Sequence, residues 1–399
     1  MLEWMASTIA RKGRPTMPVE FLGIGGTNDG SEIAPRSGPS FDKQYTLKLA
    51  RAHHDHGWDR VLFAYGSGTP DPAQVAAYVA AHVPGLQILL AHRPNVSYPT
   101  YALKTFATLD QISEGRLTVH FITGGSDHEQ RREGDVLTKD ERYARTREYI
   151  QIVKKGWTSR TPFDHEGEHY SFRDFVSDVF PVQRPRPRIS FGGSSPAAYA
   201  AGGAEADIYC LWGEPLAETA QQIAAVKEAA RAAGRTDVPR FQVAFRPVIA
   251  PTEELAWEKA HRILAALRSA GAGLRTPSGP PQNAGSRRLL EVAATGERHD
   301  RALWTATAAA TGGAGNSTAL VGTPETVAAA LLDYYDLGVE ILSARGYDIL
   351  GDAIDFGRHV IPIVREEVAK RDREAAERAR VAAERAKASV PQARIPLTR

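Results

Sequence analysis

The sequence predicts an α/β protein built as a closed (β/α)8 barrel, also called a TIM barrel. Short apolar runs of strand length alternate with segments of helical spacing. Eight such runs occur, at residues 19–24, 60–65, 86–91, 117–122, 189–191, 208–211, 241–249 and 339–343. Alternating strands and helices favour parallel pairing, and eight units favour closure of the sheet. A doubly wound open sheet is the second possibility.

The segments between these runs carry the signals of helices. Apolar residues recur at helical spacing in six of them, at 45–56, 73–82, 101–113, 142–157, 253–267 and 325–337. Gly115 follows the third segment and Pro324 precedes the last, which are usual positions for these residues at helix ends. The succession of strand and helix therefore extends over most of the chain.

Three stretches depart from this alternation. Residues 164–175 place a glycine turn between aromatic and polar residues, which predicts a small inserted hairpin. Residues 269–321 are rich in Gly, Ala, Ser and Pro, and predict a long lid loop that is mobile without ligand. Residues 366–388 predict a charged, solvated helix. The expected domains are an N-terminal extension (1–18), the barrel (19–364), and a charged C-terminal helix and tail (365–399).

Composition argues against several classes of protein. Hydrophobic residues make up 42% of the chain, enough for a large core, and the formal net charge of +2 gives no overall field that favours nucleic acid. The single cysteine, Cys210, excludes an intrachain disulfide and a zinc site of several cysteines. No apolar stretch reaches the roughly 18 residues of a membrane helix, and no signal peptide is recognisable. A cytoplasmic enzyme without a membrane partner is expected.

Barrel enzymes place their chemistry at the C-terminal ends of the strands. The run at 189–191 is followed by Gly192-Gly193-Ser194-Ser195-Pro196, in which Ser195 is suited to cap a helix that begins at Pro196. Glycines allow close approach of the backbone, and the amides and dipole of a helix N-terminus favour an anion. This turn predicts a phosphate site, although an ordinary loop between strand and helix has similar residues.

The other strand ends add hydroxyl, aromatic and cationic groups, among them Thr123, Trp212, Arg246 and Tyr347. His92 has no second ligand at metal spacing, and the sequence shows neither a hydrolytic triad nor a P-loop. Such groups suit a planar anionic cofactor. An organic cofactor is therefore expected to carry the chemistry, and no metal site is expected.

Several motifs together resemble the bacterial-luciferase-like flavin monooxygenases, and most closely the two-component alkanesulfonate monooxygenases. The motifs are AHRP (91–94), SYPT (97–100), ATLDQISEGR (107–116), FITGG (121–125), ERY (141–143), FGGSS (191–195), LWGEP (211–215), GGAG (312–315) and TALVG (318–322). The resemblance implies a (β/α)8 barrel that receives reduced FMN (FMNH2) from an NAD(P)H-dependent flavin reductase. It also implies oxygenation of a small organosulfur compound through a C4a-(hydro)peroxyflavin, and assembly as a homodimer or homotetramer.

The resemblance assigns roles to individual residues. Cofactor binding falls to residues at strand ends and on one helix, namely Thr123, Tyr143, Gly192, Gly193, Ser194 and Ser195. Arg246 is expected to hold an anionic substrate or stabilise developing negative charge, Tyr347 to donate a hydrogen bond or proton, and Trp212 to exclude water. The structural alternatives are a salt bridge for Arg246 and core packing for Tyr347 and Trp212.

The sequence departs from the family where substrate is handled. The family histidine two residues after Arg246 is Val248 here, and the family arginine before the GGAG run is Thr311. One of the arginines at 275, 287, 288, 298 and 301 is a candidate to replace that charge. Three functions stay open: an FMNH2-dependent monooxygenase, a deazaflavin (F420)-dependent oxidoreductase of the same superfamily, and a flavin-binding protein without catalysis.

Overall fold

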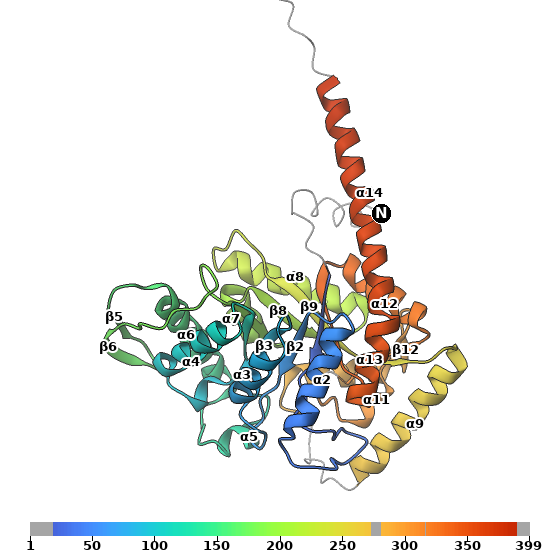
Figure 1. The fold of residues 1–399 in the computed structure, drawn as a ribbon, viewed down its shortest axis with the longest axis horizontal. Coiled ribbons are helices and arrows are strands. Elements are labelled where there is room, and N and C mark those ends of the chain that lie inside the picture. Colours follow the sequence, from blue (N-terminus) through green and yellow to red (C-terminus); the bar gives the residue numbers. More distant parts are fainter. Residues whose placement is uncertain (1–18, 273–280, 316, 389–399) are drawn as a thin grey trace, which may run out of the picture.

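The structure, a computed structural model, describes residues 19–272, 281–315 and 317–388. Eight parallel strands form a closed barrel surrounded by helices (Figure 1), which confirms the predicted fold class. The strands are β1 (Glu20–Ile24), β2 (Arg60–Phe63), β3 (Gln87–His92), β4 (Leu117–Phe121), β7 (Arg188–Gly192), β8 (Ile208–Trp212), β9 (Arg240–Ile249) and β13 (Val339–Ala344). All eight coincide with the predicted runs. The predicted extension at 1–18 and the tail at 389–399 lie outside the described residues.

The strands follow the order β9-β13-β1-β2-β3-β4-β7-β8, and β8 pairs with β9 to close the ring. Side chains alternate between the two faces of the sheet, as the period of a strand requires. Leu22, Leu89, Ile208 and Ile341 form a buried cluster inside the barrel. Their outward-facing neighbours join the larger core beneath the helices.

Several of the surrounding helices begin at residues whose side chains cap them. The surrounding helices are α2 (Lys43–Asp55), α3 (Pro72–His82), α4 (Pro99–Ile112), α6 (Lys139–Thr158), α7 (Pro196–Glu205), α8 (Leu216–Ala232), α12 (Pro324–Asp336) and α13 (Ile349–His359). Asp42 and Asp71 accept hydrogen bonds from the first amides of α2 and α3, and Thr323 does the same for α12. Short elements precede α4 and α6, namely the 3-10 helix η1 (Pro94–Val96) and α5 (Asp127–Arg131).

The segment predicted as a lid loop is mostly regular structure in its described residues, which corrects that expectation. It begins in the last turn of α9 (Glu253–Ala272), a helix predicted at 253–267, and continues as α10 (Ala284–Thr295), β10 (Arg298–His299), β11 (Leu303–Trp304), α11 (Ala306–Ala310) and most of β12 (Ala319–Gly322). β12 pairs with the C-terminal half of β9, and β11 and β10 extend this edge antiparallel. Gly271 lies in the last turn of α9 and Gly285 in the first turn of α10, whereas Gly296 and the glycines of the GGAG run follow α10 and α11. The stretch 273–280, which holds Gly273, Pro277, Gly279 and Pro280, lies outside the described residues.

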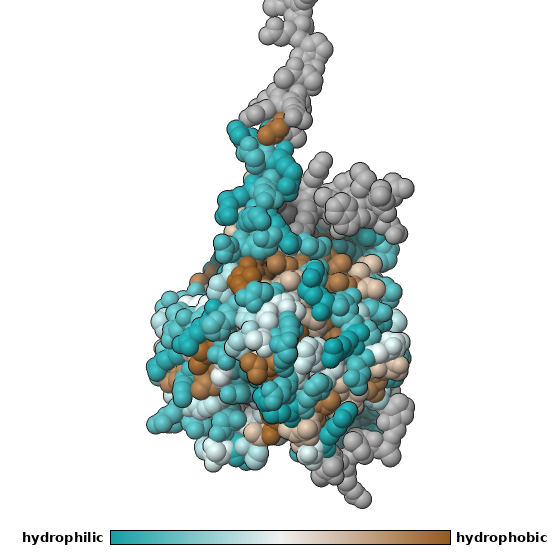
Figure 2. Space-filling view, turned by 90° about the vertical axis from the view of Figure 1, so that its right-hand side faces the viewer, coloured by the Kyte–Doolittle hydropathy of each residue, from teal (hydrophilic) through white to brown (hydrophobic). Residues whose placement is uncertain are grey.

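The predicted hairpin is confirmed as β5 (Phe163–Glu166) paired with β6 (Ser171–Phe175). The predicted C-terminal helix is confirmed as α14 (Ile361–Ala388), which begins against α12 and α13 and then projects from the body (Figure 1). Figure 2 shows mainly hydrophilic side chains on the projecting part. No helix among the described residues is long and apolar enough to cross a membrane.

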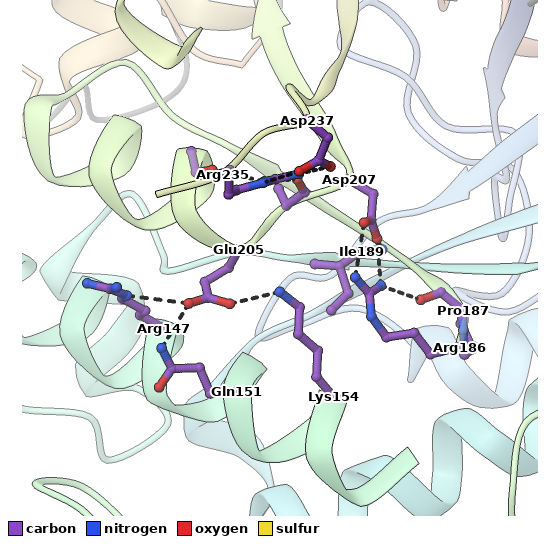
Figure 3. A network of polar contacts seen from close by, with 12 residues as sticks. Arg147, Gln151, Lys154, Arg186, Pro187, Ile189, Glu205, Asp207, Arg235 and Asp237 are labelled. Carbon is purple, nitrogen blue, oxygen red and sulfur yellow. Dashed lines mark hydrogen bonds and ion pairs between the residues drawn. The ribbon is translucent and has the colours of Figure 1, made fainter. Parts of the chain in front are cut away.

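A network of ion pairs near the N-terminal ends of β7 and β8 has separate groups, of which one joins α6 to α7 and another joins the segments that precede the two strands (Figure 3). Arg186 donates two hydrogen bonds to Asp207, at 2.6 and 3.0 Å, and Asp207 also accepts the amide of Ile189. Lys154 of α6 donates to Glu205 at the end of α7, at 2.8 Å. This network lies at the end of the barrel opposite the predicted site, where side chains stabilise the fold.

Candidate functional site

A cavity of about 400 Å³ opens at the C-terminal ends of the barrel strands. Its walls come from the ends of β1, β2, β4, β7, β8, β9 and β13, together with residues of α6 and of the segment that begins α10. Of the residues predicted to bind the cofactor, five line it, namely Thr123, Tyr143, Gly192, Gly193 and Ser194. Trp212 lines it as well. The chain thus brings residues from four distant segments into one concave site.

The turn after β7 can form only with glycine at its centre. Gly193 has a φ of 149°, and a Cβ added there would lie 2.6 Å from the Cβ of Ala198 and 3.1 Å from the hydroxyl oxygen of Tyr143. Ser195 caps α7, because its Oγ accepts the Ala198 amide at 3.3 Å. Ser195 is therefore placed to hold the helix start, while Ser194 faces the cavity. Pro196 carries no N–H and Ser195 takes the Ala198 amide, so Ala197 supplies the remaining amide of the first turn of α7.

Two residues of α6 face the same end of the cavity. Lys139 and Tyr143 are four positions apart, so they lie on one face of the helix, and both line the cavity. Burial lowers the pKa of Lys139, and the positive charge of Arg287 adds to this effect. Lys139 was not predicted from the sequence, although its spacing from Tyr143 was a usable signal.

Thr123 belongs to a tight turn that supports another wall. The Thr123 carbonyl accepts a hydrogen bond from Nε2 of Gln130 at 2.6 Å. Gly124 has a φ of 83°, and a Cβ added there would lie 1.9 Å from the same Gln130 nitrogen. The carboxamide of Gln130, which is fully buried, therefore fixes the course of the backbone beside the cavity.

Trp212 is covered by α10. A Cβ added to Gly285 would lie 2.6 and 2.7 Å from two carbons of the Trp212 ring. The GGAG run supports α10 from behind, because a Cβ on Gly313 would lie 2.5 Å from the Ser286 carbonyl oxygen. Arg288 of α10 donates to the buried carboxylate of Glu214, at 2.8 and 3.1 Å. The start of α10 is thus seated over the site.

Arg246 and Tyr347 are not among the residues that line this cavity. The Arg246 guanidinium donates to Glu32, at 2.9 and 3.3 Å, and lies 5.2 Å from the centre of the Tyr347 ring. Burial raises the pKa of Tyr347. Burial alone would also raise the pKa of Glu32, but the hydrogen bonds and charge of Arg246 and the charge of Arg345 lower it to about 2. The salt bridge foreseen as the structural alternative for Arg246 is therefore present.

The polar residues at the floor of the cavity were not predicted from the sequence. His120 shares a hydrogen bond of 2.9 Å with Ser190, whose Oγ lies 3.1 Å from Sγ of Cys210. Burial lowers the pKa of His120 to about 4 and raises that of Cys210 to about 12. The imidazole is therefore neutral and the thiol protonated near neutral pH, so this group lacks a ready nucleophile. Side chains alternate along β4, and Leu117, Val119 and Phe121 belong to the core beneath the helices. This alternation could have identified His120 as a residue that points into the barrel.

The described lid arginines do not replace the charge absent at Thr311 within this cavity. Arg287 donates to the carbonyls of Pro281 and Gln282, Arg288 to Glu214, and Arg301 to Asp333, while Arg298 stacks on Trp257. Arg275 lies outside the described residues. The arginine that lines the cavity is instead Arg345, just after β13. Among the described residues, no group of three or more His, Cys, Asp or Glu side chains is arranged to hold a metal ion.

Residues 24–340 match the family model described as luciferase-like monooxygenase. The chain belongs to this family. The matched segment includes β2, β3, β4, β7, β8 and β9 in full, and it overlaps β1 and β13 only at its two limits. The match confirms the family suggested by the sequence motifs.

Solved structures share the fold of this luciferase-like protein. Riboflavin lyase, crystallised with modified FMN and riboflavin, is 22% identical over 88% of this chain and 92% of the lyase, with a TM-score of 0.71. EDTA monooxygenase from Chelativorans sp. BNC1 is 18% identical over 88% of this chain and 94% of its own, with a TM-score of 0.72. An F420-dependent secondary alcohol dehydrogenase is 15% identical over 87% of this chain and 99% of the dehydrogenase, with a TM-score of 0.64.

Proposed function

We propose that this protein is a monooxygenase that uses reduced FMN and O2 on a small organosulfur anion, such as an alkanesulfonate or a related compound. The observation that carries the proposal is one end of the cavity, where Gly193, Ser194, Tyr143 and Lys139 meet at the start of α7. The positive end of the α7 dipole, a hydroxyl, a phenol and an ammonium group together suit a phosphate.

The remainder of the cavity suits the flavin ring system. Its volume of about 400 Å³ lies within the range of about 300–1,000 Å³ common for ligand sites. Trp212 and Thr123 also line the cavity. Bound there, reduced FMN would supply the reaction with O2 that protein side chains cannot carry out.

The chain's own residues would bind, orient and exclude water. The start of α10 covers Trp212, which limits access of water to the site. Arg246 would balance negative charge on the substrate, and Tyr347, held beside it, would donate a hydrogen bond. Both lie beside the cavity of about 400 Å³, called the main cavity below. Arg345 lines this cavity and donates to Glu32, the same carboxylate that accepts from Arg246.

Partners follow from the same proposal. A diffusible NAD(P)H-dependent flavin reductase would supply FMNH2, and the subunits would assemble as a homodimer or homotetramer. The presence of an F420-dependent enzyme among the structural relatives supports a second candidate, an oxidoreductase that uses reduced F420.

A coupled assay tests the proposal. The protein is mixed with a flavin reductase, NADH and FMN, and a panel of alkanesulfonates, sulfones and neutral analogues is supplied under 18O-labelled O2. We expect substrate-dependent O2 uptake and one labelled oxygen in the product. Turnover that requires reduced F420 and no O2, or peroxide release alone with every compound, would contradict the proposal.

A further inference from the structure

One carboxylate lies between two arginines beside the main cavity. Glu32 accepts hydrogen bonds from Arg246 at 2.9 and 3.3 Å and from Arg345 at 2.8 and 3.2 Å. Both guanidinium groups thus present paired donors to the same two oxygens. This is the geometry with which arginine recognises a carboxylate or another oxyanion.

The two arginines are held more firmly than the carboxylate. Arg246 lies within β9 with a side chain that is 6% exposed, and the Arg345 amide donates to the Phe245 carbonyl at 3.2 Å. Glu32 belongs to the loop between β1 and α2, and its side chain is 35% exposed. Residues 34–40 of that loop are exposed. The carboxylate is therefore the partner that can leave with the smaller change in structure.

Arg345 is reached from two adjoining cavities. It lines the main cavity and a second one of about 220 Å³, and the two also share Ile24 and Ala64. The second cavity has apolar walls that include Phe63 and Val75. Arg345 Nε is buried and has no hydrogen-bond partner within the described part of the chain. A small molecule with an acidic head and a short apolar body fits this arrangement.

We propose that Glu32 is an internal occupant of an oxyanion site formed by Arg345 and Arg246, and that the acidic group of the substrate takes its place. Exchange of one anion for another keeps a negative charge between the two buried guanidinium groups, whereas loss of Glu32 without a replacement would remove that charge. The ligand class is a small carboxylate or sulfonate with at least two free oxygens. This inference rests on the proposed function for its role in turnover, but the site can be tested without flavin.

The test measures binding of methanesulfonate and acetate by calorimetry, on the full chain without flavin and at low chloride. Glu32→Gln removes the internal anion and keeps the side-chain shape. Asp29→Asn is the matched control, because it removes one carboxylate from the same loop, where Asp29 bonds to Ser37. We expect Glu32→Gln to bind at least one probe about 10- to 100-fold more tightly than the wild type and the control. Adding Arg345→Met should abolish this gain.

Displacement in the wild type is tested by hydrogen exchange. Saturating methanesulfonate or acetate should increase exchange at residues 29–37, and Arg345→Met should abolish the increase. Unchanged exchange with both probes, equal affinity in Glu32→Gln and Asp29→Asn, or tight binding that survives Arg345→Met would overturn the inference. If Glu32→Gln fails to fold, Glu32→Asp, which retracts the carboxylate, must still bind a probe more tightly than the control. Absence of oxygenase activity would contradict the proposed function alone, since this test uses neither flavin nor O2.

Discussion

Gly285 is the point at which α10 meets the cavity wall, and replacing it with alanine tests whether α10 is seated on Trp212. The added methyl would lie 2.6 and 2.7 Å from two ring carbons, about 1 Å closer than the usual carbon contact of about 3.5–4.0 Å. Overpacking of this kind costs about 1–3 kcal/mol. The lower conformational entropy of the unfolded alanine variant offsets about 0.4–1 kcal/mol of that cost.

Gly68→Ala is the matched control, because no atom lies within 4 Å of a Cβ added at Gly68. We expect Gly285→Ala to lower the free energy of unfolding by about 1–3 kcal/mol relative to Gly68→Ala, measured by urea denaturation. Hydrogen exchange should increase at residues 284–295, and FMN binding should weaken. Equal stability of the two variants, with unchanged exchange and unchanged flavin affinity, would refute the account of α10 as a cover over Trp212.

Three further predictions concern charge. Ser194→Asp should weaken FMN binding by about 4 kcal/mol, the repulsion of unit charges about 4 Å apart near a protein surface, whereas the isosteric Ser194→Asn should bind nearly normally in the same titration. Arg246→Ala should lower kcat/KM about 100- to 1,000-fold and change unfolding stability much less; a loss confined to stability would make Arg246 structural. Burial holds the pKa of His120 near 4 in the folded protein, below its ordinary 6.5. The stability associated with the neutral imidazole is therefore fully present above pH 6.5 and is lost as pH falls through 4. Denaturation curves of the wild type should show the free energy of unfolding fall by about 3 kcal/mol between pH 6.5 and pH 4 because of this group, and His120→Asn should lack that part of the fall.

The barrel was predictable because each of its strands is a short, mostly apolar run. The runs at 86–91 and 117–122, for example, became β3 and β4, whose residues pair in parallel register. β10 and β11 were not predictable, since each has two residues and carries no periodic signal. The composition of 269–321 concealed α10, although Asn283 caps that helix by accepting the Ser286 amide at 3.0 Å.

The candidate site was predictable only where local sequence dictates local geometry. The turn at Gly193 requires glycine, and the strand and helix around it were readable from the residues. The pairing of Glu32 with Arg246 joins residues 214 positions apart, and no local pattern announces it. Arg345 was overlooked for the same reason, because its role depends on where the loop after β1 places a carboxylate.

The proposed function requires that the cavity hold reduced FMN by its phosphate. An anaerobic titration of the full chain with reduced FMN, reduced riboflavin and reduced F420, followed by flavin absorbance or fluorescence, tests it most directly. We expect reduced FMN to bind about 100-fold or more tightly than reduced riboflavin, since riboflavin lacks the phosphate that Ser194, Tyr143 and Lys139 would contact. Equal affinity for FMN and riboflavin, or preferential binding of F420, would contradict it.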